Sequence, residues 1–158
     1  MTGLIIIHSI LRYAVILLTL IVAGQSLMGI FSKGAFKGTN KITALLMMIS
    51  CDIQLLVGGA LYFMGGYMGG LKDGGMKITY NRFYGLEHPL SMVIAIVLVH
   101  LAYMVAKKAM MSGPKFRKMF IYTAIAGLLF LAMTPWPNKK DVGKPYFPGT
   151  AFTVNEAH

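Results

Sequence analysis

Four long apolar runs, separated by shorter polar connections, dominate the chain. They cover about residues 4–31, 42–64, 86–106 and 119–135. Each run is close to the roughly 20 residues that an α-helix needs to cross the hydrocarbon core of a bilayer. The pattern predicts an all-α membrane protein. The even number of runs and their short connections predict an antiparallel up-down bundle of four transmembrane helices.

Two further segments divide the chain around these runs. Residues 65–76 are rich in glycine and are expected to form a loop that is mobile or held by a partner. Residues 1–136 make the predicted transmembrane domain, and residues 137–158 make a tail outside it. Because Pro135 and Pro137 stand at the junction, the tail is not expected to begin as a helix.

The composition agrees with a membrane location. The chain is 56% hydrophobic and 13% charged, whereas a soluble domain carries about 25% charged residues. Its net charge of +10 does not indicate nucleic-acid binding, because the basic residues lie in short connections rather than on one folded polar face. We therefore expect contact with the lipid bilayer, including anionic lipids, and no nucleic-acid partner.

The distribution of positive charge predicts the orientation of the helices. The connection at 32–41 carries Lys33, Lys37 and Lys41, and the connection at 107–118 carries five basic residues; neither contains an acid. Short basic loops of this kind stay on the cytoplasmic side of a membrane. Both termini, the Gly-rich loop and the tail are therefore predicted to lie outside the cytoplasm.

Polar residues gather near the outer ends of the first and third helices. These are His8 and Arg12, and then Glu87 and His88. A charged side chain in hydrocarbon costs at least about 2.5–3.5 kcal/mol, so these groups are expected to turn inward. One interpretation is a buried salt bridge from Arg12 to Asp52 or to Glu87 that determines helix order. The other is a redox cofactor, quinone or proton site that opens to the outer face.

A second polar group, made of Asp52, Gln54 and His100, is predicted near mid-membrane. His100 follows His88 by twelve residues, which places the two side chains about 120° apart around the helix axis. The two histidines therefore do not suit stacked haems. We expect His100 to form a hydrogen bond with Asp52, Gln54 or Tyr103. An Asp52–His100 pair could relay protons if water reaches it.

His8 and His88 meet the depth requirement of a bis-histidine haem b site. Such a site needs two neutral imidazoles at similar depth on facing helices, each with an acceptor for its second ring nitrogen. The first and third helices of an antiparallel bundle usually lie on a diagonal, so the haem would lie across the core. Glu87 or Ser91 would supply the acceptor. Histidines that only mark the membrane boundary are the alternative.

Motifs of hydrolase and nucleotide chemistry are absent from the sequence. There is no P-loop, G-x-S-x-G, H-E-x-x-H or C-x-x-C. Methionines near the outer face could bind Cu(I), although packing is the commoner role of this residue. They are Met64, Met68, Met76 and Met92. We do not expect the chain to be an enzyme on its own.

Short motifs in the first three helices carry a resemblance to a known family. The motifs are HSILRY at 8–13, IQLLVG at 53–58, LYF at 61–63, EHP at 87–89, and His100. Over most of the chain up to Trp136, the sequence resembles small bacterial four-helix membrane proteins that are labelled cytochrome b-like. The resemblance implies a role linked to haem b or quinol in the bacterial inner membrane. It also implies His8, Arg12, Glu87 and His88 as site residues.

Two main hypotheses for the function follow. In the first, the chain is an electron-transfer subunit that binds haem b or a quinone near the outer face. His8 and His88 would be metal ligands or hydrogen-bond partners, Arg12 would balance a propionate or quinone oxygen, and Glu87 would orient an imidazole. In the second, the chain is a non-catalytic accessory subunit of a larger membrane or envelope complex. A transporter or proton channel that uses Asp52 and His100 is the third hypothesis.

Overall fold

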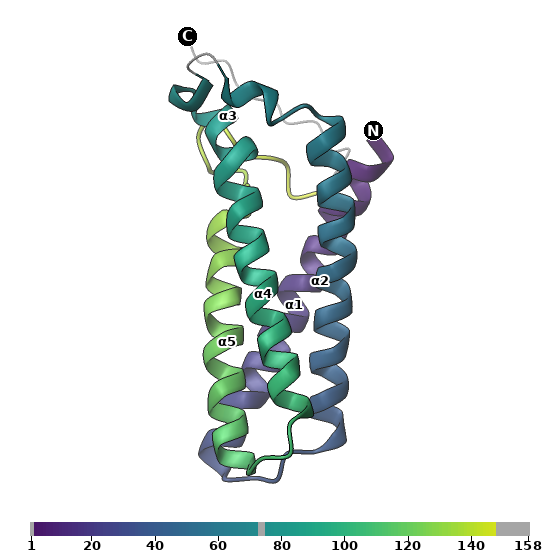
Figure 1. Ribbon diagram of the computed structural model, residues 1–158, viewed down its shortest axis with the longest axis vertical. Helices are drawn as coiled ribbons and strands as arrows, with labels where there is room; N and C mark the ends of the chain where they lie inside the picture. Colours follow the sequence, from purple (N-terminus) through teal and green to yellow (C-terminus); the bar gives the residue numbers. More distant parts are fainter. Residues whose placement is uncertain (1, 73–74, 148–158) are drawn as a thin grey trace.

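The computed structural model describes residues 2–72 and 75–147, and these residues form helices and connections without a β-strand. Four long helices lie side by side along the long axis (Figure 1). They are α1 (Thr2–Ser32), α2 (Gly38–Met64), α4 (His88–Lys107) and α5 (Ser112–Met133). A short helix, α3 (Thr79–Arg82), leads through a π-helical turn, η3 (Phe83–Glu87), directly into α4. Two single helical turns, η1 (Gly69–Leu71) and η2 (Gly75–Lys77), precede α3.

Four helices are long and apolar enough to cross a membrane: α1, α2, the continuous helix Thr79–Lys107, and α5. Their outward faces carry large exposed aliphatic side chains, such as Leu56 of α2 and Leu128 of α5, which are 74% and 68% exposed. Exposed aliphatic side chains at this density are typical of helices that face lipid. These features indicate a multi-pass membrane protein.

The helices are longer at their starts than the apolar pattern predicts. The second and fourth helices begin at Gly38 and Ser112, not near residues 42 and 119, because a first turn tolerates polar residues and proline. The third begins at Thr79, upstream of the predicted start at 86. The fourth ends at Met133, since Thr134 precedes a proline and has an extended backbone.

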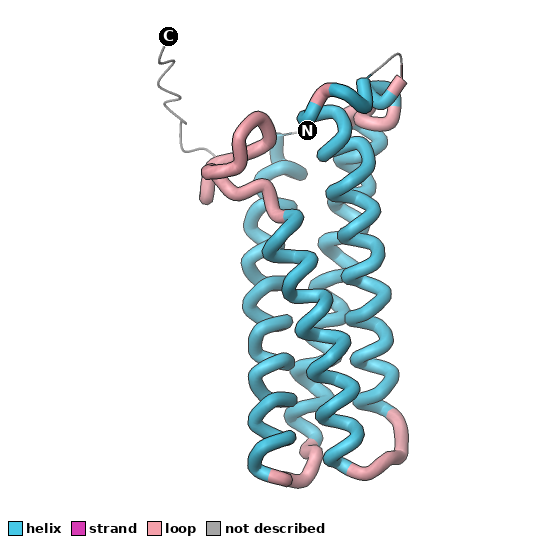
Figure 2. Tube along the Cα trace, turned by 90° about the vertical axis from the view of Figure 1, so that its left-hand side faces the viewer, coloured by secondary structure: helices cyan, strands magenta, loops and turns pink. Residues whose placement is uncertain are grey.

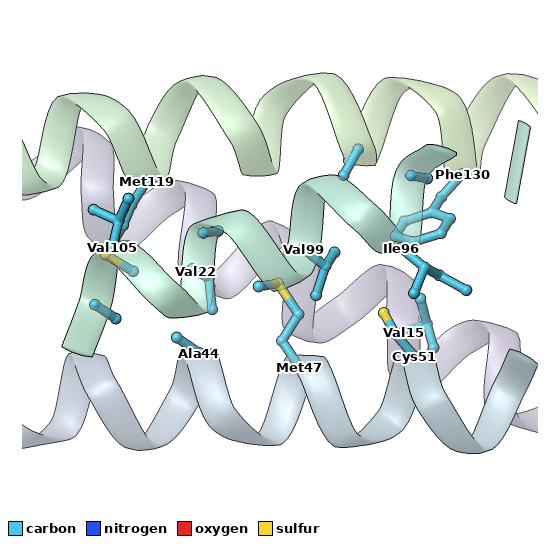
Figure 3. Close-up of a cluster of buried hydrophobic side chains, with 14 residues drawn as sticks. Val15, Val22, Ala44, Met47, Cys51, Ile96, Val99, Val105, Met119 and Phe130 are labelled. Carbon is cyan, nitrogen blue, oxygen red and sulfur yellow. The ribbon is translucent and has the colours of Figure 1, made fainter. Parts of the chain in front are cut away.

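The helices pack so that α1 and α4 each contact both α2 and α5, which leaves α1 and α4 on a diagonal. This agrees with the expected diagonal placement of the first and third helices. Figure 3 shows the buried cluster at the centre of the bundle, which contains both small and large apolar side chains. Fully buried members include Val22, Ala44, Met47, Cys51, Val99 and Met119.

The connections separate the bundle into two ends. The loops at 33–37 and 108–111 lie at one end (Figure 2). The start of α1, the segment from 65 to 78 and residues 134–147 lie at the other, which we call the upper end because it is uppermost in Figure 1. Residues 134–147 contain no helix, as predicted for the start of the tail. The rest of the predicted tail, 148–158, lies outside the described residues.

Candidate functional site

A cavity of about 590 Å³ lies in the upper half of the bundle, between all four long helices. Its walls come from α1, α2, α4 and the end of α5, and residues 134, 135, 144 and 145 also line it. The volume falls within the range of about 300–1,000 Å³ that is usual for small-molecule and cofactor sites. Four of the predicted polar site residues line it, namely His8, Arg12, Gln54 and His88, and so does Met92, one of the methionines considered for Cu(I).

His8 of α1 and His88 of α4 face each other across the diagonal of the bundle. Their ring centroids are 6.4 Å apart, with an interplanar angle of 75°. Nδ1 of His88 lies 2.8 Å from the carbonyl oxygen of Met133. Because a carbonyl only accepts hydrogen bonds, Nδ1 carries the proton and Nε2 keeps its lone pair. This is the arrangement in which a histidine binds a metal through Nε2.

The imidazole of His8 is held against α2. The Gln54 amide nitrogen donates to the backbone oxygen of His8 at 3.0 Å and lies 3.4 Å from its Nε2. The ring lies directly over Gly58, where an added Cβ would come within 2.9 Å of Cε1 of His8. Gly58 therefore provides the space that His8 occupies.

Unpartnered polar atoms converge on this cavity. In the described part of the chain, the buried side-chain nitrogen or oxygen atoms without a hydrogen-bond partner are Nδ1 of His8, Nε of Arg12 and Oε1 of Gln54. All of these residues line the cavity. A buried polar group left unpaired costs about 1–3 kcal/mol, so such atoms rarely gather without a reason. Their common location indicates a site for a ligand with both donors and acceptors.

Arg12 is held by residues 145 and 146 rather than by an acid. Its Nη2 donates to the carbonyl oxygens of Pro145 and Tyr146 at 3.1 and 2.6 Å, and to the Tyr13 hydroxyl at 3.0 Å. The guanidinium also lies over the Trp136 ring, 5.9 Å from its centroid. The predicted salt bridge from Arg12 to Asp52 or Glu87 is therefore wrong. Backbone carbonyls from outside the helices satisfy the cation instead.

Replacing Arg12 with Gln is expected to loosen the segment at residues 145–146. Hydrogen bonds to a charged group contribute about 1.5–3 kcal/mol each, so local opening of the segment should rise about tenfold or more. The rate of chymotrypsin cleavage after Tyr146 in detergent measures this opening. Lys33→Gln, at the opposite end of the bundle, is the matched control, and equal cleavage rates in both variants would contradict the assigned contact.

Glu87 contacts Arg82 and not a histidine. Its Oε1 lies 2.7 Å from Nε of Arg82, and both side chains are partly exposed. The two residues are five positions apart at the two ends of the π-helical turn, whose wider spacing brings them together. The expected role of Glu87 in orienting an imidazole is taken by the Met133 carbonyl. Glu87 also does not line the cavity.

The predicted mid-membrane polar group divides into two. Oδ1 of Asp52 lies 3.2 Å from Nε2 of His100, which confirms one of the expected hydrogen-bond partners. Gln54 faces His8 on the other side of α2. Nδ1 of His100 lies 2.9 Å from the Ile96 carbonyl. The side chains of Asp52 and His100 are each 42% exposed, and neither residue lines the cavity.

Aromatic and basic residues outside the predicted site lie around His88 at the upper end of the bundle, and two of them, Tyr84 and Lys144, line the cavity. The rings of Phe83 and Tyr84 lie 5.7 and 6.4 Å from the His88 ring, and the Lys144 ammonium lies 5.6 Å from the Tyr84 ring. Lys139 donates to the Ala132 carbonyl. Burial lowers the pKa of Lys139, and the nearby Glu87 carboxylate raises it in part. Lys144 follows the last helix by several residues, so only folding shows that it lines the cavity.

Comparisons with protein-family models, with curated proteins and with solved structures found no match for this chain. The site is therefore defined by the contacts within the bundle. Two imidazoles on diagonal helices, an unpartnered guanidinium nitrogen and an unpartnered amide oxygen share one cavity. This arrangement can coordinate a metal centre from two sides and can bind an anionic or carbonyl group beside it.

Proposed function

We propose that the chain is a membrane electron-transfer subunit that binds haem b between His8 and His88. The facing of these two imidazoles within the cavity is the observation that supports the proposal. With a metal–nitrogen bond of about 2 Å, two axial imidazoles on one metal have ring centres about 6 Å apart. The separation of 6.4 Å between the His8 and His88 rings is close to this value.

The other groups in the cavity also suit a haem. The unpartnered Nε of Arg12 can donate to a propionate carboxylate, and Lys144 lines the same part of the cavity. The Met133 carbonyl fixes the tautomer of His88, and Gln54 and Gly58 fix the position of His8. Bound haem supplies one-electron transfer, which the side chains of this chain do not offer. The protein would bind it, orient it and exclude water from it.

The experiment that tests the proposal is a visible spectrum of the purified protein in mild detergent, reduced minus oxidised, with pyridine haemochrome quantitation. We expect a sharp α-band and about one haem b per chain. A featureless spectrum, from protein expressed with sufficient haem supply, would contradict the proposal. The accessory-subunit hypothesis would then account better for the same residues.

A quinone is the second candidate ligand. Ile5, Leu55 and Val93 line the cavity and are also exposed on the outside of the bundle, so the cavity reaches the surface that faces lipid. Nε of Arg12 would donate to a quinone carbonyl. Extraction of the purified protein with organic solvent followed by chromatography distinguishes the two ligands, because a quinone is extracted intact and gives no haemochrome.

The proposed function also requires an orientation in the membrane. We propose that the helices cross a bacterial inner membrane in alternating directions, with the upper end and both termini outside the cytoplasm. The basic connections at the lower end, which include Lys33 and Lys37, support this orientation under the positive-inside rule.

Cysteine labelling in intact cells tests the orientation. A cysteine placed at Asn138 is expected to react with a membrane-impermeant maleimide, whereas a cysteine placed at Gly34 is expected to react only after the cells are opened. The native Cys51 is buried and serves as an unreactive background. The reverse pattern of labelling would place the upper end in the cytoplasm.

A further inference from the structure

The Asp52–His100 pair lies on the outside of the bundle, where α2 and α4 meet. These two helices lie side by side (Figure 1) and pack less closely than the other neighbouring pairs. Residues one turn from the pair on the same side are large, exposed and apolar, namely Ile49 and Leu56 of α2 and Val97 and Met104 of α4. We call this surface, together with Asp52 and His100, the α2–α4 face. The pair is its polar centre.

The pair lies deep within the membrane-spanning part. Asp52 is twelve residues from Met64, where α2 ends at the upper end of the bundle. His100 is seven residues from Lys107, where α4 ends at the lower end. At about 1.5 Å per residue, these separations correspond to roughly 18 and 10 Å along the helices. Lipid head groups and water do not satisfy polar atoms at such a depth. Any further hydrogen bond to the pair has to come from protein.

The hydrogen bonds of the pair are complete on the histidine side only. His100 uses Nδ1 with the Ile96 carbonyl and Nε2 with Oδ1 of Asp52, so both ring nitrogens are occupied. The Asp52 carboxyl group can accept several hydrogen bonds, and the described residues provide it with this one contact. The pair therefore presents an acceptor, and not a donor, to whatever covers the face.

A second copy of the chain cannot supply the donor through the same face. In a symmetric dimer each partner presents the same residues. The side chains that surround the pair, Ile49, Leu56, Val97 and Met104, have no hydrogen-bond donor, and His100 has none to spare. A symmetric dimer through these side chains would leave Asp52 with the same single contact.

We propose that the α2–α4 face is the docking surface for a transmembrane helix of another protein, which donates a hydrogen bond from a hydroxyl or amide side chain to Asp52. The partner is thus a mid-membrane Ser, Thr, Asn or Gln on an otherwise apolar helix. This inference does not depend on which cofactor the cavity binds.

A peptide-association measurement in vesicles tests the inference. The probes are two Leu/Ala-rich transmembrane peptides that differ only at the central position, Asn or Leu, each with a donor dye. The protein carries an acceptor dye at its C-terminus, and the vesicles are phosphatidylcholine with phosphatidylglycerol. Energy transfer is expected to show about threefold or tighter association of the Asn peptide than of the Leu peptide, as membrane hydrogen bonds permit.

Three variants make the result specific to this face. Asp52→Leu is expected to abolish the preference for the Asn peptide, and Leu56→Trp is expected to block it by bulk without changing the polar pair. Leu128→Trp, an equally exposed position on α5, is the matched control and should keep the preference. Helix content and the thermal unfolding midpoint, both from circular dichroism, identify a variant that has failed to fold.

Defined outcomes would overturn the inference. Equal association of the two peptides with the unmodified protein would do so, as would a preference that survives both Asp52→Leu and Leu56→Trp. Energy transfer between two copies of the chain that is lost in Asp52→Leu would show that a second copy occupies the face instead.

Discussion

Replacing His88 with Ala is expected to remove haem b from the purified protein, and replacing His8 with Ala is expected to do the same. Each variant leaves one imidazole in the cavity, which cannot hold the haem from both sides. The loss should reduce the haemochrome signal to background while the helix content remains unchanged. The measurement is the ratio of haem to protein after purification in detergent.

His100→Ala is the matched control for this experiment. His100 is also a histidine of the membrane-spanning part, but it pairs with Asp52 and does not line the cavity. It should keep the full amount of haem. Full haem in both the His8 and the His88 variants would contradict the proposed ligands, and loss of haem only in the His100 variant would move the site to the α2–α4 face.

Gly58→Ala is expected to weaken haem binding without removing either ligand. The added methyl group would lie 2.9 Å from Cε1 of His8, so the imidazole has to shift away from α2 and from its place opposite His88. Changes to groups that orient a metal ligand typically lower metal affinity about 10–100-fold. Haem titration of the apoprotein, followed by absorbance, should show a decrease of about tenfold or more.

A glycine of α1 outside the cavity offers a control of the same chemistry. An added Cβ at Gly24 meets no atom within 4 Å and Gly24 does not line the cavity, so Gly24→Ala should bind haem as the unmodified protein does. Both substitutions add one methyl group inside a long helix and raise its helix propensity equally. Equal affinities in the two variants would show that His8 is not held against Gly58 when haem is bound.

Residue depth along a helix was accessible from the sequence. The position of His8 and His88 near one end of the first and third apolar runs led to their expected proximity, and their rings do meet across the bundle. The same argument led to the Asp52–His100 pair. Depth is predictable because the rise per residue of an α-helix is nearly constant and the apolar runs show where each helix lies in the bilayer.

The direction of each side chain around the helix axis separates Asp52 from Gln54, which the predicted polar group had placed together. Asp52 and Gln54 are two residues apart, so their side chains point about 200° apart and cannot share one polar site. In the structure Gln54 faces His8 and the cavity, whereas Asp52 faces α4 and the outside of the bundle. This division follows from the geometry of an α-helix, although deciding which of the two faces inward required the packing of α2.

The four apolar helices, their approximate bounds and the depth of each polar side chain could be predicted from the sequence, because they depend on local composition and helical rise. The partners of Arg12 and His88 could not be predicted, because they depend on how distant segments pack. Their hydrogen bonds go to backbone carbonyls of Tyr146 and Met133, and every residue carries a carbonyl, so no residue type marks such an acceptor in advance. The contacts form only when distant segments fold onto the same end of the bundle.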